Sequence, residues 1–380
     1  MKHFHILTRR NFLSYASKAG VAAALASLTD IPLVAKRALA AESNLGRNGK
    51  KVLFIFLRGA NDALNSVVPI EDPAYVTARP TLAIPKDPAT NYTTLGAADN
   101  PVNTGAADPT FGYPYAIRLG NGFAALHPSL KFLAPLYNSG DLALVHRVGY
   151  PKQSRSHFDS QNYWENGSPG NDVAKDGIFY RMILESGLAS TAALTGVSFQ
   201  SSLPLILRGS QAAMTNLSDP SRYSLLSVPP NNPAGVEKAK AALRAGTSFE
   251  APFKRSRDLL TLQYQNMQDT MSIFASLDFD APYVDDMNTD GDTGPYNLFP
   301  NSNAQNGGYA MHGNDPAKYV VPTGSYGFFE DLKAAAIVLN KTDAIIAGTQ
   351  LGGFDTHSNQ GGLTGSHPNL QRIIGWSMYA

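Results

Sequence analysis

The segment Val52–Leu57 is a continuous run of apolar residues, and it constrains the fold of this chain more than any other feature. A strand that is apolar at every position is typical of a parallel sheet whose two faces are both covered. Two later stretches, 195–200 and 344–351, also predict strands, and a helical stretch at 326–340 lies just before the second of them. Alternating strands and helices favour an α/β fold with a doubly wound, mostly parallel sheet and helices on both faces.

Shorter elements and two insertions are predicted around this sheet. Apolar spacing and turn residues predict a short helix at 128–137, a strand at 142–148, a helix from Ser154 to about Glu165, a very short strand at 205–207, helices at 234–245 and 253–277, and a helix from Pro368 onward. Two stretches, 86–122 and 280–323, are rich in small and polar residues without a sustained period. They predict long polar insertions.

The N-terminus carries the pattern of a twin-arginine export signal. Arg9 and Arg10 precede a mildly apolar segment at 20–35, which is too short and too interrupted to span a bilayer. Ala38 and Ala40 then form a small-x-small cleavage site. We therefore expect a signal peptide at 1–40, a linker at 41–51 and a single α/β domain at 52–380.

The signal predicts export by the twin-arginine translocase to the periplasm or beyond. The alternative is an arginine pair on an ordinary amphipathic N-terminal helix. The order of arginine pair, apolar segment and cleavage site favours the signal.

Composition excludes several classes of function for the mature chain. Removing residues 1–40 takes away six basic residues and one acidic residue, so the net charge changes from +1 to −4. A nucleic-acid-binding protein would be basic with clustered charge. No second long apolar run follows the signal, so no membrane anchor is expected in the mature chain. The chain has no Cys, which excludes disulfides, a Cys nucleophile and Cys-based zinc sites.

Acidic and histidine side chains follow two of the predicted strands. Asp62 comes shortly after the first strand, and Asp355 and His357 come after the strand at 344–351. In open α/β sheets, functional residues gather at the carboxyl ends of the strands. A carboxylate and an imidazole two residues apart can meet one cation of the zinc, calcium or magnesium type. Asp62 equally suits a turn or a helix N-cap, and that alternative stays open.

The segment Ser154-Arg155-Ser156-His157 brings hydroxyl, guanidinium and imidazole groups to the start of a predicted helix. A helix start and an arginine both favour an oxyanion, and a serine there can act as a nucleophile. The sequence does not choose between Ser154 and Ser156, and either serine can instead be an ordinary N-cap.

The second insertion contains part of a calcium-loop pattern. Asp286, Asn288 and Asp290 stand at alternate positions before Gly291, as in the first half of such a loop. Asn297 occupies the position of the bidentate glutamate, so a solvated polar loop is favoured over a calcium site. Of the remaining histidines, His127 and His146 are expected to be packing or turn residues, and His312 and His367 lie in Gly/Pro-rich loops with no obvious partners.

Several motifs together resemble a known family. They are Phe56–Pro69, Pro73–Tyr75 with Arg79–Ile84, Leu126–Pro128, Val148–Pro151 leading to Ser154–Phe158, and Gly353–His357. In order and spacing they resemble the exported bacterial family called domain of unknown function 1501, from about Lys51 to the end. That family looks like a branch of the alkaline phosphatase and sulfatase superfamily. The resemblance implies a doubly wound sheet with a one-metal or two-metal site at its rim.

The resemblance also implies roles for individual residues. Asp62 resembles a metal ligand after the first strand, and Asp355 with His357 resembles the central ligand pair. Ser154 and Arg155 resemble the segment that bears the nucleophile and the oxyanion-binding arginine.

Two departures from the superfamily pattern weaken these roles. A sulfatase-type nucleophile is normally made from Cys, and this chain has Pro151 at that place. The family also continues past the position of Ala380 into segments with further ligands, so we expect a C-terminally incomplete domain that binds metal poorly. The leading hypothesis is a metal-dependent hydrolase of phosphate or sulfate esters. The alternative is a non-catalytic exported binding or surface-assembly protein on a degenerate hydrolase scaffold.

Overall fold

The computed structural model describes the sheets of this chain and many of its helices. The described residues are 50–86, 115–130, 133–171, 173–188, 194–212, 214–219, 270–271, 273–281, 283–285, 296–301 and 321–380, with single residues and pairs between 232 and 242. The predicted signal peptide, the helices predicted at 234–245 and 253–277, the calcium-loop pattern and the interiors of both insertions lie wholly or mostly outside them.

The chain divides into two compact units. Unit 1 comprises Met1–Leu53, Tyr150–Leu277 and Val338–Ala347, and unit 2 comprises Phe54–Gly149, Asp278–Ile337 and Gly348–Ala380.

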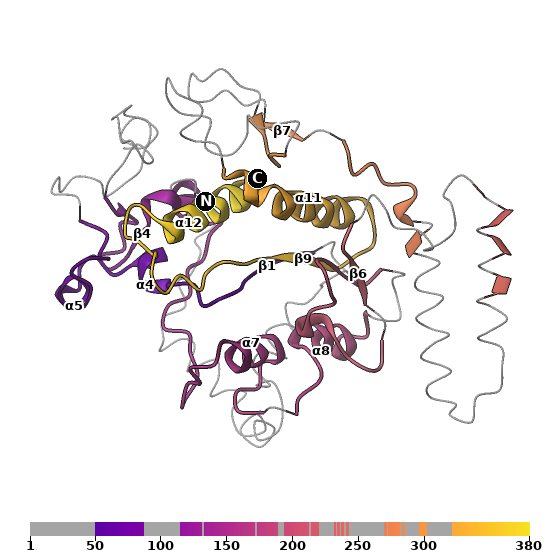
Figure 1. Cartoon of the computed structure of the whole chain (residues 1–380), viewed down its shortest axis with the longest axis horizontal. Coiled ribbons are helices and arrows are strands. Elements are labelled where there is room, and N and C mark those ends of the chain that lie inside the picture. The colour runs from indigo at the N-terminus through magenta and orange to yellow at the C-terminus, as the bar shows by residue number, and fades with distance from the viewer. Residues whose placement is uncertain are drawn as a thin grey trace, which may run out of the picture. The chain divides into compact units, whose positions relative to one another are not determined.

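A four-stranded sheet has the strand order β1-β9-β5-β6, and Figure 1 labels its strands β1, β9 and β6. Its members are β1 (Val52–Leu57), β9 (Ile346–Leu351), β5 (Gly196–Phe199) and β6 (Thr215–Leu217). The sheet is mostly parallel, and only β5 and β6 are neighbours that also follow one another in the chain. Parallel neighbours need crossover connections. The expected mostly parallel sheet of an α/β fold is therefore confirmed, as are the strands predicted at 52–57, 195–200 and 344–351.

The burial of the strands differs from the prediction. The apolar run of β1 predicts two covered faces, yet only Phe54 is buried and Leu53 is 42% exposed. Within the described sheet, β1 is an edge strand. β9 comes closer to the expected pattern, because every residue except Gln350 is buried.

Strands β1 and β9 approach closely at Gly348. A Cβ atom on Gly348 would lie 2.2 Å from the carbonyl oxygen of Phe54 and 2.5 Å from a ring carbon of that side chain. Glycine at this position therefore lets the Phe54 ring be buried against β9.

We expect Gly348→Ala to lower the free energy of unfolding by about 2 kcal/mol, the usual range for overpacking a tight contact. Urea unfolding midpoints measure the change. Gly352→Ala is the matched control, since a Cβ there meets nothing within 4 Å. Equal midpoints for the two variants would contradict the close approach of the strands.

Helices and one large apolar cluster form the core of unit 2. The helical elements are η1 (Pro128–Leu130), α6 (Leu133–Ser139), η7 (Thr323–Ser325), α11 (Tyr326–Lys341), which extends into unit 1, and α12 (Ser366–Tyr379). Trp376 of α12 and Phe329 of α11 are fully buried in the cluster, and Trp376 Nε1 donates to the carbonyl oxygen of Leu298 at 2.9 Å. The helices predicted at 128–137, at 326–340 and from Pro368 are present.

Two small antiparallel sheets also belong to unit 2. The first has the order β2-β4-β3, and the second pairs β7 with β8. Their strands are β2 (Val67–Val68), β4 (Ala125–Leu126), β3 (Ile117–Arg118), β7 (Val284–Asp285) and β8 (Tyr296–Asn297), and the short helices α4 (Ala63–Ser66) and α5 (Pro73–Ala78) lie near the first sheet in the chain. Ala116, Ile117 and Leu119 are buried, so the end of the first predicted insertion contributes to the core.

Unit 1 contains two helices that pack on a short turn. They are α7 (His157–Asn166) and α8 (Ile178–Glu185), and the turn is η3 (Leu205–Leu207). Glu165 of α7 is buried, and its Oε2 accepts a hydrogen bond from the backbone N–H of Ile206 at 2.9 Å. The helix predicted after Ser154 is confirmed.

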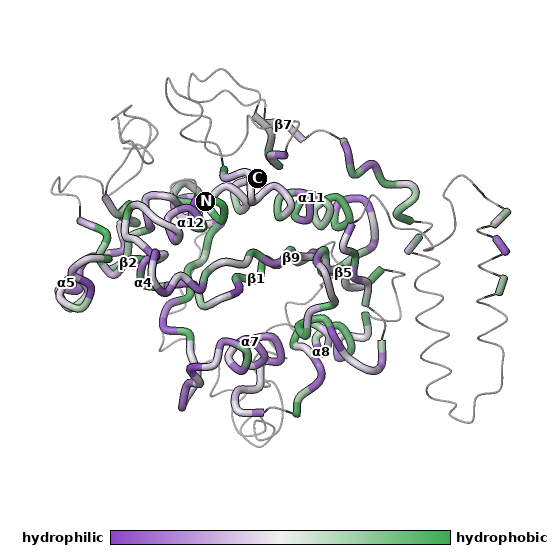
Figure 2. The backbone as a smooth tube through the Cα atoms, viewed as in Figure 1, coloured by the Kyte–Doolittle hydropathy of each residue, from purple (hydrophilic) through white to green (hydrophobic). Residues whose placement is uncertain are grey.

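Hydropathy along the backbone follows these environments (Figure 2). Helix α8 is largely hydrophobic, whereas α7 is largely hydrophilic and leaves much of its surface exposed. Among the helices in the described part of the chain, none is both long enough and apolar enough to cross a membrane.

Two predicted strands are wrong. Over 142–148 the described backbone forms no strand, because Leu142 and Leu144 pack on the unit 2 core while Val145 is 80% exposed and no strand pairs alongside. The segment Leu205–Leu207 forms a 3-10 turn, in which the N–H of Leu207 donates to the carbonyl oxygen of Pro204 at 3.1 Å.

Candidate functional site

The loops that follow β1 and β9 begin side by side in unit 2. The N–H of Arg58 donates to the carbonyl oxygen of Leu351 at 2.9 Å, and the N–H of Phe354 donates to the carbonyl oxygen of Arg58 at 3.1 Å. Because the strands are parallel, the two loops leave the same edge of the sheet. One loop carries Asp62 and the other carries Asp355 and His357.

The loop after β1 has a tight and partly strained turn. Gly59 has φ +103°, and a Cβ there would lie 2.6 Å from the backbone nitrogen of Asp355. Ala60 has φ +65°, a left-handed conformation that costs a non-glycine residue about 1 to 2 kcal/mol. Glycine at 59 thus permits the close contact between the two loops.

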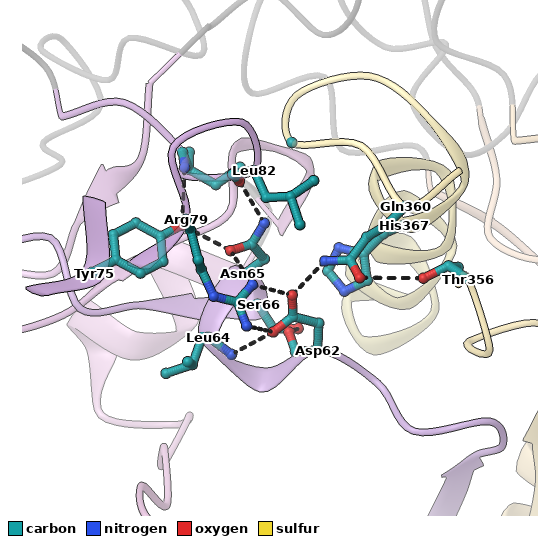
Figure 3. Close-up of polar contacts among 12 residues, drawn as sticks. Asp62, Leu64, Asn65, Ser66, Tyr75, Arg79, Leu82, Thr356, Gln360 and His367 are labelled. Atoms are coloured by element: carbon teal, nitrogen blue, oxygen red, sulfur yellow. Dashed lines mark hydrogen bonds and ion pairs between the residues drawn. The ribbon is translucent and has the colours of Figure 1, made fainter. Parts of the chain in front are cut away.

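Asp62 is an N-cap and an ion-pair partner (Figure 3). Its Oδ1 accepts from the N–H of Leu64 at 3.2 Å and from Arg79 Nη2 at 3.0 Å, and its Oδ2 accepts from Arg79 Nη1 and Gln360 Nε2. Burial raises the pKa of Asp62, but the hydrogen bonds and charge of Arg79, with help from Gln360, outweigh it and hold the pKa below its usual value. Asp62 is therefore a helix N-cap, which is the alternative that the sequence left open. A cation bound by Asp62 would have to displace the hydrogen bonds from Arg79 and Gln360.

Arg79 and Asn65 belong to a polar network behind Asp62 (Figure 3). Asn65 Oδ1 accepts from Tyr75 Oη at 2.8 Å and from Arg79 Nη1 at 3.2 Å. Asn65 Nδ2 donates to the carbonyl oxygen of Leu82 at 2.7 Å, and the N–H of Ile84 donates to Tyr75 Oη at 2.9 Å. Burial raises the pKa of Tyr75, so the phenol remains protonated as a donor. This network ties the segment after β1 to the segment ending at Ile84.

Two buried histidines lie on the other side of this loop. His367 Nε2 lies 3.1 Å from Asn61 Oδ1 and 3.1 Å from Gln371 Nε2. His127 and His367 are fully buried, and their rings meet edge to face with centroids 6.2 Å apart. Sequence reasoning missed both residues as network members, because Asn61, which His367 contacts, and Gly362, which His127 contacts, are far away in the chain.

Asp355 and His357 form an exposed pair at the edge. His357 Nε2 lies 2.6 Å from Asp355 Oδ1, and their side chains are 79% and 48% exposed, respectively. They belong to a group of His and Asp residues that could hold a metal ion. An oxygen and an imidazole nitrogen this close suit a borderline or hard divalent cation, so the pair fits the expected metal better than Asp62 does.

The predicted serine segment lies in unit 1, at the start of α7. Ser156 is the N-cap, and its Oγ accepts from the N–H of Asp159 at 3.2 Å. Ser154 Oγ donates to Asp159 Oδ2 at 3.0 Å. Arg155 and His157 are exposed. The expected clustering of this segment with Asp62, Asp355 and His357 stays a prediction.

Comparison of the chain with protein-family models, with curated proteins and with solved structures found no match.

Proposed function

We propose that this chain is an exported, metal-dependent hydrolase of phosphate or sulfate esters with an alkaline phosphatase-like, doubly wound domain. The observation that carries the proposal is the meeting of two strand-end loops at one sheet edge, one with Asp62 and one with the Asp355–His357 pair. The motif order described above supports it, as does the twin-arginine pattern for a periplasmic or extracellular location.

In this proposal, Asp355 and His357 hold a divalent cation of the zinc, calcium or magnesium type. A bound cation would polarise an ester oxygen. The guanidinium of Arg155 binds the anionic oxygens of the substrate, and the hydroxyl of Ser154 or Ser156 is the nucleophile.

A second candidate is a non-catalytic binding or surface-assembly protein on the same scaffold. The specific observation in its favour is the state of Asp62, whose two carboxylate oxygens already accept hydrogen bonds from Arg79 and Gln360. The Asp355–His357 pair alone supplies two protein ligands, and a catalytic zinc site usually has three.

Metal binding and turnover separate the two candidates. We expect the wild-type protein to bind Zn²⁺ or Mn²⁺ weakly, and the variant Asp355→Ala/His357→Ala to bind it at least tenfold more weakly still, a loss of about 1.4 kcal/mol or more in binding free energy. Calorimetric titration measures binding, and p-nitrophenyl phosphate and p-nitrophenyl sulfate measure turnover.

His146→Gln is the control for this experiment, since His146 is also exposed and stands outside the pair. Equal metal affinity in the wild type and the double variant would show that Asp355 and His357 do not bind the metal. Folded protein that binds no metal and hydrolyses neither ester would favour the second candidate.

A further inference from the structure

The two serines at the start of α7 differ in what their hydroxyl groups can do. Ser156 Oγ accepts the N–H of Asp159, which is the ordinary bond of a helix N-cap. Ser154 Oγ accepts the N–H of Ser156 at 3.1 Å and donates its proton to the carboxylate Oδ2 of Asp159 at 3.0 Å. Of the two serines, only Ser154 therefore donates its hydroxyl proton to a carboxylate.

The backbone of Ser154 is held on both sides. Its N–H donates to Tyr150 Oη at 3.0 Å, and its carbonyl oxygen accepts from Ser160 Oγ at 3.0 Å. Ser160 has one hydroxyl proton and uses it on that carbonyl, so the 2.7 Å contact between Tyr150 and Ser160 requires the tyrosine to donate. The Tyr150 ring packs edge to face on Tyr163, with centroids 5.5 Å apart.

A second serine–aspartate pair in the chain shows that the hydrogen bond alone is not distinctive. Ser139 Oγ lies 2.6 Å from Asp141 Oδ2, and it also lies 3.0 Å from the carbonyl oxygen of Leu136. Its single proton is therefore shared between two acceptors. Ser154 differs because its hydroxyl donates to Asp159 alone among the described residues, and because its backbone is held by Tyr150 and Ser160.

We propose that Ser154, and not Ser156, is the reactive hydroxyl of this chain, that Asp159 accepts its proton, and that Tyr150 and Ser160 are positioning residues. The inference rests on the proposed ester hydrolase function and names phosphate monoesters as the substrate class. The bond from Ser154 Oγ to phosphorus forms while the bond from phosphorus to the ester oxygen breaks. The ester oxygen leaves with the bonding electrons, the serine proton passes to Asp159, and water later cleaves the phosphoserine.

A carboxylate suits this role because phosphoryl transfer has a loose transition state. The attacking hydroxyl needs orientation more than strong deprotonation, and an aspartate that accepts the hydroxyl proton provides it in protein kinases. Half-buried Ser154 beside exposed Asp159 leaves the pair open to a substrate from solution.

Diisopropyl fluorophosphate tests the inference without requiring turnover. It reacts when Ser154 Oγ bonds to phosphorus, fluoride leaves and the proton passes to Asp159. Peptide mass spectrometry should find the adduct on Ser154 in the wild type and no adduct in Ser154→Ala. Asp159→Asn keeps an acceptor oxygen but loses the basic carboxylate, so the labelling rate should fall at least tenfold.

Asp141→Asn is the matched control and should leave the rate unchanged. A circular dichroism melt for each variant separates chemical effects from loss of folding. An adduct on Ser156, or equal rates in the wild type and Asp159→Asn, would overturn the inference.

Turnover of p-nitrophenyl phosphate separates this inference from the proposed function. Labelling of Ser154 without turnover would contradict the proposed hydrolase function but would support Ser154 as a reactive hydroxyl. Turnover that survives Ser154→Ala would keep the hydrolase and overturn the serine assignment. Absence of both labelling and turnover would overturn both.

Discussion

Replacing Asp62 by Ala is expected to lower the free energy of unfolding by about 3 kcal/mol. Loss of an N-cap costs about 1 kcal/mol. Loss of one partner of a buried ion pair costs about 3 to 5 kcal/mol, and the partial exposure of this pair, 13% for Asp62 and 22% for Arg79, reduces that figure. Urea unfolding monitored by circular dichroism measures the sum.

Two control variants apportion the effect. Asp72 caps α5 in the same unit by accepting a hydrogen bond from the N–H of Ala74 at 2.9 Å. Asp72→Ala should therefore lower the free energy of unfolding only by the contribution of an N-cap, about 1 kcal/mol. Asp62→Asn retains a capping oxygen and removes the charge, so its loss should fall between the two alanine variants. If Asp62→Ala proved no worse than Asp72→Ala, the ion pair with Arg79 would contribute no stability.

The same variant decides whether Asp62 is also a metal ligand. A cation that binds only the folded state raises the unfolding midpoint, and the increase is larger when the affinity is higher. If Asp62 is a ligand, the increase produced by Zn²⁺ or Mn²⁺ should disappear in Asp62→Ala. If Asp62 serves only Arg79 and Gln360, the increase should persist in the variant and depend on Asp355 and His357 alone.

Sequence reasoning predicted the sheet because local patterns determine it. Val52–Leu57 and the stretch at 344–351 have the length and apolar content of strands, and the glycines after them mark turns. The burial of β1 was not predictable, since burial depends on which strand lies beside it. The segment 142–148 shows the same limit: its alternating leucines contact a core, but a strand also needs a partner backbone.

The candidate site was predictable only where its residues are near in sequence. Asp355 and His357 are two positions apart, and the structure places them in contact. Asp62 has its partners at positions 79 and 360, and nothing local in the sequence specifies them. Such long-range polar networks form because a buried charge must be satisfied, and the tertiary fold chooses the partner.

His127 should make unit 2 sensitive to mild acid. Its Nδ1 accepts the N–H of Ser129 at 3.0 Å, so the proton of the neutral ring is on Nε2, which then donates to the carbonyl oxygen of Gly362 at 3.0 Å. A second proton on Nδ1 would break the bond to Ser129. Burial, and next the neighbouring His367, lower the pKa of His127 from 6.5 to about 4, against the opposing effect of the bond to Gly362.

The sign and size of the effect follow from these values. Above about pH 6.5 the ring is neutral in both states, and the full stability is present. As the pH falls from 6.5 towards 4, the unfolded chain takes up a proton that the folded chain refuses, so stability is lost. The shift corresponds to roughly 3 kcal/mol at 1.36 kcal/mol per pKa unit, and the loss is complete below about pH 4.

Urea midpoints at pH 7.5, 5.5 and 4.5 measure this loss. His127→Gln retains a donor near the position of Nε2 and cannot titrate, so its stability should start lower at pH 7.5 and fall less between pH 6.5 and 4. His146→Gln, which removes an exposed histidine, should keep the slope of the wild type.

His367 is also buried, and its pKa is also lowered chiefly by burial, so part of the acid-induced loss of stability should remain in His127→Gln. The contribution of Asp62, whose pKa is below its usual 3.8, is lost only at lower pH and does not overlap this window. An identical slope in the wild type and His127→Gln would show that the buried ring of His127 is not the acid-sensitive group.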